Sequence, residues 1–264
     1  MSDTHAFLER AWRRNPYDSD LARAHSAYAG YDGAELARLL ETTVPGPFER
    51  VAHAAFRGFV QAPDFSCLGA RAALARGTYR FGAYGTLGSE AATAGLARDL
   101  YAFAAERRGF ESSFTTFVSV FRDFASDVDA EAGFEEARWR QLEALHALDS
   151  RLHRPDPRVS NDPDDPHFSY SFAETAFFVV GLHPGASRSA RRFAWPALVF
   201  NAHEQFEQLR EAGRFERLRD QIRRREIQLD GSLNANLTDY GTHSEARQYA
   251  GRPVDEEWRC PFRP

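Results

Sequence analysis

Residues 65–84 read Phe65-Ser-Cys-Leu-Gly-Ala-Arg-Ala-Ala-Leu-Ala-Arg-Gly-Thr-Tyr-Arg-Phe-Gly-Ala-Tyr84, and this stretch sets the pattern of the whole chain. Its first half is rich in Ala, Leu and Arg, which favour a short helix beginning at Cys67. Its second half, Thr78 to Tyr84, has the aromatic content of a strand. A thiol at a helix N-terminus has a lowered pKa and tends toward the thiolate. Because thiolates are nucleophiles and metal ligands, this is the first candidate for chemistry.

Downstream of this stretch the hydrophobic pattern alternates between helix and strand. The apolar spacing predicts helices over residues 89–108, 131–152, 203–211 and 215–228. Runs rich in Phe and Val predict strands over residues 114–121, 176–182 and 196–200. This order indicates an α+β fold, a single domain with a small central sheet, mostly antiparallel or mixed, covered by helices.

The flanks of this core differ from it in pattern. Residues 1–62 have the Ala and Leu spacing of short helices, over 18–31, 33–44 and 47–60, so a helical N-terminal segment precedes the core of residues 63–264. Four prolines between Arg154 and His167 predict an irregular loop. No linker divides the chain, so residues 1–264 are expected to form one domain.

Composition excludes several classes of protein. The chain has 264 residues, of which 43% are hydrophobic, enough for a sizeable core. The net charge of −5 gives no sign of the basic surface that binds nucleic acid. No apolar run approaches the roughly 18 residues of a membrane span. Two distant cysteines do not make a secreted disulfide framework, and the N-terminus lacks an apolar signal core. We therefore expect a cytoplasmic protein that binds neither nucleic acid nor membrane.

Cys67 permits three interpretations from the residues alone. It can be an inert buried thiol, a nucleophile with a histidine partner, or a thiolate ligand of iron. Cys260 is interpreted as structural, and two cysteines cannot build a four-cysteine metal site. His183 ends one predicted strand and His203 begins a helix just after another. Each histidine can serve as a metal ligand, a proton donor or a hydrogen-bonded structural residue.

Several charged residues add candidate binding groups. Arg188, Arg191 and Arg192 follow His183 closely and can bind carboxylates if they lie beside the strand end. The basic run that starts at Arg223 is interpreted as a solvated helix face. The tail is dense in polar side chains. Its Asp239 and Glu245 are carboxylates that can face a cationic substrate.

A set of motifs in a fixed order resembles the YqcI/YcgG family over about residues 60 to 264. The motifs are Phe65-x-Cys67 with Arg80-Phe-Gly82, Phe177-Phe-Val-Val-Gly-Leu-His-Pro184, Arg191-Arg-Phe-x-x-Pro-x-Leu-Val-Phe-Asn201 with His203-Glu-Gln-Phe206, Asp239-Tyr-Gly241, Ser244-Glu-Ala-Arg-Gln-Tyr249 and Cys260-Pro-Phe262. Two positions depart from the pattern. Ser66 stands where proline is expected before the cysteine. Residues 172–175 lack an expected glycine, which could alter the substrate pocket.

The resemblance implies haem chemistry. Members of the family look like haem-dependent N-oxygenases, which hydroxylate nitrogen in arginine-type guanidines or related amines during small-molecule biosynthesis. On this chain the resemblance makes Cys67 the candidate axial ligand of haem b, with His203 and then His183 as rivals. The three arginines after His183 would hold propionates or a substrate carboxylate. Glu174 or Glu245 would pair with the cationic nitrogen, and His183 or His203 would shape the distal side or relay protons.

The leading hypothesis is therefore a haem-dependent monooxygenase that N-hydroxylates a small guanidine or amine, such as an arginine-like amino acid. It would use O2 and electrons from a separate donor, because the chain has no flavin, NAD or iron–sulfur signature. A homodimer is left open as the assembly of the chain. Two alternatives stay open, a haem-binding sensor or carrier without turnover and a metal-free cysteine-dependent hydrolase or transferase.

Overall fold

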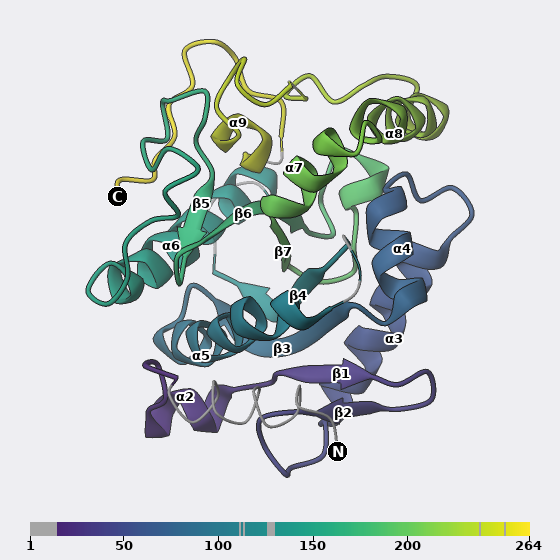
Figure 1. Cartoon of the computed structure of the whole chain (residues 1–264). Coiled ribbons are helices and arrows are strands. Elements are labelled where there is room, and N and C mark those ends of the chain that lie inside the picture. The colour runs from purple at the N-terminus through teal and green to yellow at the C-terminus, as the bar shows by residue number, and fades with distance from the viewer. Residues whose placement is uncertain (1–14, 111, 113, 126–129, 238, 251) are drawn as a thin grey trace.

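The computed structural model describes residues 15–110, 112, 114–125, 130–237, 239–250 and 252–264 (Figure 1). Within them the chain forms one seven-stranded mixed sheet and eight α-helices, which confirms the predicted α+β class. The helices that the structure describes include none long and apolar enough to cross a membrane.

The sheet has the strand order β2-β1-β3-β4-β7-β6-β5. Its strands are β1 (Ala29–Tyr31), β2 (Leu36–Arg38), β3 (Tyr79–Leu87), β4 (Thr116–Phe124), β5 (Tyr170–Phe172), β6 (Thr175–Leu182) and β7 (Ala197–Ala202). Only β3 and β4 pair in parallel, and the other described neighbours are antiparallel. A parallel pair needs a crossover, and α5 (Glu90–Glu106) supplies it.

The remaining helices follow the predicted order closely. They are α2 (Asp20–His25), α3 (Pro47–Gln61), α4 (Leu68–Arg76), α6 (Ala130–Asp149), α7 (Glu204–Glu211), α8 (Phe215–Asp230) and α9 (Ala246–Tyr249). Two short 3-10 helices lie at Arg107–Gly109 and Ser189–Arg191. The side chain of Ser89 caps α5 by accepting the N–H of Ala92, and Cys67 is the N-cap residue of α4. The predicted start of a helix at Cys67 is confirmed.

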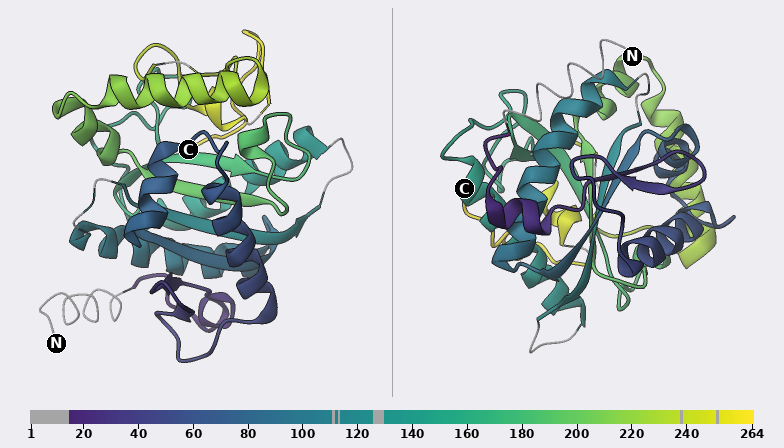
Figure 2. Two further views of the ribbon diagram at one scale, coloured as in Figure 1. Left: turned by 90° about the vertical axis from the view of Figure 1, so that its right-hand side faces the viewer. Right: turned by 90° about the horizontal axis from the view of Figure 1, so that it is seen from below.

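Helices cover both faces of the sheet. α5 and α6 pack on one face and α3 and α4 on the other, as the view along the sheet in Figure 2 shows. Side chains alternate between these faces along β4, with Phe117 and Phe121 toward α5 and Val118 and Val120 toward α3. Both faces are apolar, as is expected for a strand near the centre of a sheet.

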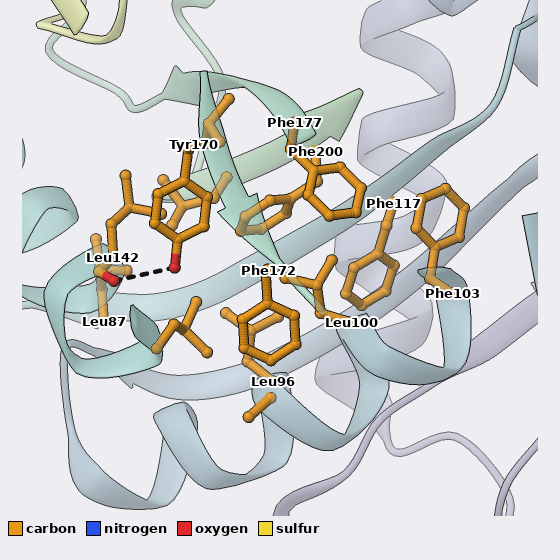
Figure 3. Close-up of a cluster of buried hydrophobic side chains, with 14 of the residues drawn as sticks. Leu87, Leu96, Leu100, Phe103, Phe117, Leu142, Tyr170, Phe172, Phe177 and Phe200 are labelled. Carbon is orange, nitrogen blue, oxygen red and sulfur yellow. Dashed lines mark hydrogen bonds between the residues drawn. The ribbon is translucent and has the colours of Figure 1, made fainter. Parts of the chain in front are cut away.

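Aromatic rings fill the core on the α5 side (Figure 3). The ring of Phe117 lies 5.7 Å from that of Phe103 and 6.4 Å from that of Phe200, between centroids. The hydroxyl of Tyr170 donates to the carbonyl of Leu142 at 3.0 Å, so a buried polar group is satisfied. The high aromatic content thus builds this core.

The N-terminal segment is not wholly helical, contrary to the prediction. Residues 1–14 lie outside the described residues. Of the stretches expected to be helical, 18–31 ends in β1 and 33–44 contains β2, so these two strands form a hairpin instead. Asp32 accepts backbone N–H groups from Ala34 and Glu35 at 2.8 Å, and Gly33 has a φ of 107°. This turn chemistry competes with a helix, and the pairing of β1 with β3 then decides the outcome.

The turn between β5 and β6 explains the departure seen at residues 172–175. Phe172 pairs with Thr175, so Ala173 and Glu174 form a two-residue hairpin loop, with φ of 50° and 56°. Such loops favour glycine because L-residues are strained at positive φ. Neither Ala173 nor Glu174 lines the cavity described below.

Replacing Glu174 by Gly should raise the free energy of unfolding by about 0.5–1 kcal/mol, because the strain of the left-handed backbone is relieved. The measurement is urea unfolding of the purified protein. The control is Glu136→Gly on the exposed side of α6, which should lower stability by about 1 kcal/mol. A destabilising Glu174→Gly would contradict this account of the turn.

Candidate functional site

A cavity of about 250 Å³ opens on the α4 side of the sheet, beneath α8. β6 and β7 form its floor, and α4, α7, α8 and the segment leading to α9 form its walls. Its apolar lining comprises Phe114, Phe178, Val180, Phe206, Phe215, Leu218, Ile222 and Leu237. Mostly apolar walls with a few polar groups are typical of small-ligand sites.

Helix α8 covers the cavity, and its apolar side chains are only partly buried. Phe215, Leu218 and Ile222 recur along one side of the helix and line the cavity. No residue of α8 is fully buried. The apolar stripe of this helix therefore faces the hollow instead of a packed core.

Cys67 lies in the wall of this cavity, at the N-terminus of α4. The backbone N–H groups of Gly69 and Ala70 lie in the first turn of α4, on the side of the Cys67 sulfur, and favour the thiolate. Burial raises the pKa of the Cys67 thiol, and these two N–H groups oppose the rise without overcoming it. The predicted lowering of this pKa is wrong for the free thiol, because desolvation outweighs the helix N-terminus.

The loop before Cys67 is tied to α8. The guanidinium of Arg225 donates to the carbonyl of Pro63 at 2.5 Å and to that of Phe65 at 3.0 Å. Ser66, which stands where proline was expected, is buried. These contacts fix the loop before Cys67 against α8, although position 66 is serine and not the expected proline.

Glu245 places a carboxyl group in the same cavity. Its side chain is 7% exposed, and burial raises its pKa to about 8, with hydroxyls of Ser169 and Tyr249 opposing the rise. A carboxyl group with this pKa is mostly protonated at neutral pH. The Tyr249 hydroxyl lies 3.2 Å from Oε2 of Glu245 and donates to the carbonyl of Phe177 at 2.6 Å.

His203 lies one layer behind the cavity wall. Its Nδ1 is 3.7 Å from Oε1 of Glu245 and its Nε2 is 3.2 Å from Oε1 of Glu207, while its ring lies 4.6 Å from that of Tyr240. Burial lowers the pKa of His203. Glu207 is 44% exposed, so the histidine connects a buried carboxyl group with one that reaches solvent.

Three arginines that sequence reasoning did not assign to a site line the cavity. Arg219 and Arg223 of α8 both bind Asp239, at 3.2 Å and 3.0 Å, and Arg210 of α7 lies with them. The interpretation of the Arg223 run as a solvated face is wrong for Arg223 itself. The signal was present, because residues 215, 218, 219, 222 and 223 share one side of a helix.

The arginines expected to hold carboxylates do not line the cavity. Arg188 binds Asp230 at 3.4 Å and the Ser232 hydroxyl at 3.0 Å. Arg192 donates to the carbonyl of Ala186 at 2.9 Å. Both guanidinium groups are therefore engaged by neighbouring protein groups outside the cavity.

Arg191, His183 and Glu174 also lie outside the cavity wall. Arg191 donates to the carbonyl of Gln248, whose side chain lines the cavity, so it acts one layer back. His183 stacks on Phe134 of α6, with centroids 4.4 Å apart, which places it on the other face of the sheet. Glu174 is exposed in the β5–β6 turn. The structure therefore brings together Cys67 and Glu245, with His203 behind them.

The cavity wall contains no histidine among the described residues. Nor does any group of three or more His, Cys, Asp or Glu side chains in the described part of the chain form a metal site.

The fold and cavity define an α+β protein in which a half-buried thiol and a buried carboxyl group line one mostly apolar cavity. The YqcI/YcgG family model matches residues 56–263, and the chain belongs to this family. The match spans every described residue that lines the cavity. No curated protein and no solved structure matched the chain.

The raised pKa of Glu245 predicts a pH-dependent stability. Burial moves this pKa from 4.5 to about 8, so between these values the folded protein holds a proton that the unfolded chain has lost. Its contribution to folding stability therefore falls as pH rises through this window, by at most about 1.4 kcal/mol per pH unit. Glu245→Gln should remove that part of the slope.

The measurement is the free energy of urea unfolding at pH 5, 6, 7 and 8. Glu216→Gln, at an exposed position of α8, is the control and should keep the wild-type slope. If Glu245→Gln also keeps it, the carboxyl group is not held protonated by burial.

Proposed function

We propose that this protein is a haem-dependent monooxygenase that N-hydroxylates a small guanidine or amine, such as an arginine-like amino acid. One observation carries the proposal beyond the family resemblance. The cavity joins the half-buried thiol of Cys67 to a buried carboxyl group, Glu245, across apolar walls. A thiol suits an iron ligand and a carboxyl group suits a cationic nitrogen.

The residues of the cavity fit haem b by their chemistry. Cys67 would be the axial ligand, and the half-buried stripe of α8 would pack on the macrocycle. Arg219 and Arg223, paired with the half-exposed Asp239, would hold the propionates in place of the arginines after His183. Haem bound through a thiolate supplies the oxygen chemistry, since the axial thiolate pushes electron density to iron and favours O–O cleavage.

The surroundings of Cys67 suit a thiolate once iron is bound. Cys67 would ligate iron as the thiolate, because metals bind the deprotonated sulfur. The N–H groups of Gly69 and Ala70, which oppose the rise in the pKa of the thiol, would then stabilise the charged sulfur.

Glu245 would bind and orient the substrate. A carboxyl group with a pKa near 8 is neutral before binding, and a guanidinium or ammonium group favours its ionised form. The resulting charge-assisted hydrogen bond would fix the nitrogen that is hydroxylated. The apolar walls exclude water around this pair and strengthen it.

A proton route from the surface to this carboxyl group would pass through His203. Conversion of N–H and O2 to N–OH and water consumes two protons and two electrons, the electrons coming from a separate donor. The Nε2 of His203 lies 3.2 Å from the half-exposed Glu207, and its Nδ1 lies 3.7 Å from Glu245, a gap that a water would bridge. A cysteine-dependent hydrolase has less support, because the described cavity wall offers Cys67 no histidine base.

Absorption spectroscopy with haem tests the proposal directly. The wild-type protein should bind haem, and its reduced CO complex should show the strongly red-shifted band of thiolate ligation. Cys67→Ala should lose that band. Cys260→Ala is the matched control, because Cys260 is buried outside the cavity, and it should keep the band.

Absence of a haem spectrum in the wild type would refute the proposed function. An unshifted band in both wild type and Cys67→Ala would assign the ligand to another residue. Haem binding without amine-dependent oxygen consumption would identify a sensor or carrier.

Glu245→Gln should lower kcat/KM for a cationic guanidine substrate by about 10- to 100-fold, the range expected for one hydrogen bond to a charged group. A neutral urea analogue of the same shape should bind the variant as well as it binds the wild type. Glu216→Gln is again the control. Equal losses for the cationic and neutral ligands would show that the carboxyl group acts only through packing.

A further inference from the structure

The side chain of Arg138 is a fully buried cation without a hydrogen-bond partner. It belongs to α6, and the residue is 0% exposed. Its Nε, Nη1 and Nη2 all lack a hydrogen-bond acceptor among the described residues. The guanidinium carbon lies 5.1 Å from the Trp139 ring centroid and 5.9 Å from that of Phe134. These contacts leave its five N–H groups unsatisfied.

Two neighbouring side chains share this property. The indole Nε1 of Trp139 and the Nδ1 of His183 are buried and also lack partners within the described part of the chain. His183 stacks on Phe134, the same ring that lies beside Arg138. Arginine and tryptophan can only donate hydrogen bonds, whereas the Nδ1 of a neutral histidine donates or accepts according to its tautomer. The N–H groups of Arg138 and Trp139 therefore need a group that accepts hydrogen bonds.

The nearby acid does not neutralise Arg138. Glu135 is engaged by the Arg252 guanidinium at 2.6 Å and by the Trp258 indole N–H at 3.0 Å. Burial is the main cause that lowers the pKa of both Arg138 and His183, and the positive charge of Arg191 adds to it, while Glu135 opposes the shift at Arg138. Glu131 is the acid that opposes this effect at His183.

A buried charge without a partner costs several kcal/mol of folding free energy. A native fold that keeps one therefore points to a bound partner of opposite charge. The space is small, because a Cβ at Gly181 would lie 3.2 Å from Nη1 of Arg138 and 2.7 Å from the Phe134 ring.

We propose that Arg138 binds a compact monovalent anion, of the size of chloride or formate, buried between α6 and the end of β6. The guanidinium edge holds the anion by charge-assisted hydrogen bonds, and Arg191 contributes a second positive charge. This site is separate from the cavity that contains Cys67, and the inference does not depend on the proposed function.

The site is connected with α9 through Arg191. The Arg191 guanidinium donates to the carbonyl of Gln248, and α9 contacts β6 through the Tyr249 hydroxyl, which donates to the carbonyl of Phe177. An anion that offsets two adjacent arginines therefore stabilises the attachment of α9. Because Glu245 is the N-cap residue of α9, the anion also steadies the cavity wall.

Thermal unfolding at constant ionic strength tests the proposal. Sodium chloride or sodium formate replaces sodium gluconate, whose anion is too large for the site. The wild-type Tm should rise with the logarithm of anion concentration above the dissociation constant. Arg138→Met should lose this dependence. Arg140→Met, which removes an arginine that is 48% exposed on the same helix, should keep it.

Chloride and formate acting alike would show recognition of any compact monoanion, whereas formate acting alone would identify a carboxylate. Equal slopes in wild type and Arg138→Met would overturn the proposal. If Arg138→Met does not fold, crystals of the wild type grown in bromide decide the question. An anomalous peak within hydrogen-bond distance of the guanidinium supports the site, and water alone at that position refutes it.

Discussion

The pairing of β6 with β7 decides on which side of the sheet each side chain of the site lies. Phe178 pairs with Asn201, and Val180 pairs with Val199. Phe178, Val180 and Asn201 line the cavity. The residues between them, such as Phe177, face the core formed with α5. Since side chains alternate strictly along a strand, a slip of one residue would exchange core and cavity. The aromatic core therefore fixes the register that the site requires.

Burial sets the charge state of the ionisable groups around the cavity. It raises the pKa of Cys67 and Glu245 and lowers that of His203, so each group favours its neutral form. The same groups charge readily when a partner of opposite charge arrives. Neutral groups lower the cost of burial in an empty cavity, and the proposed ligand would draw a thiolate and a carboxylate from them.

The sequence predicts the long elements of the fold because their apolar periods are strong. Both long helices and the strand containing Phe177 lie within a few residues of their predicted bounds. The hairpin around Gly33 could not be predicted in this way, because a strand of three residues is held by its neighbour β3 and has little pattern of its own.

Candidate site residues could be predicted where the residue type or its sequence context is unusual. They could not be predicted where the packing of the fold decides which of many similar side chains reaches the cavity. Cys67 stands out as one of two cysteines, and Glu245 belongs to a polar tail segment that has reason to pack. Among 33 basic residues, by contrast, proximity in sequence favoured the arginines after His183. The position of α8 instead places Arg219 and Arg223 at the cavity, and that position depends on contacts distant in sequence.

Helix α8 stays over the cavity because polar contacts hold it at two places. Arg225 reaches the carbonyls before Cys67, and Asp230 at the last turn binds Arg188. An amphipathic helix normally gains most of its stability by burying its apolar face. Here the polar ties take over part of that role, and Phe215, Leu218 and Ile222 remain half-buried. A ligand that buried this stripe would gain the free energy that the protein alone does not gain from it. An apolar occupant gains affinity from α8 and stabilises the helix in return.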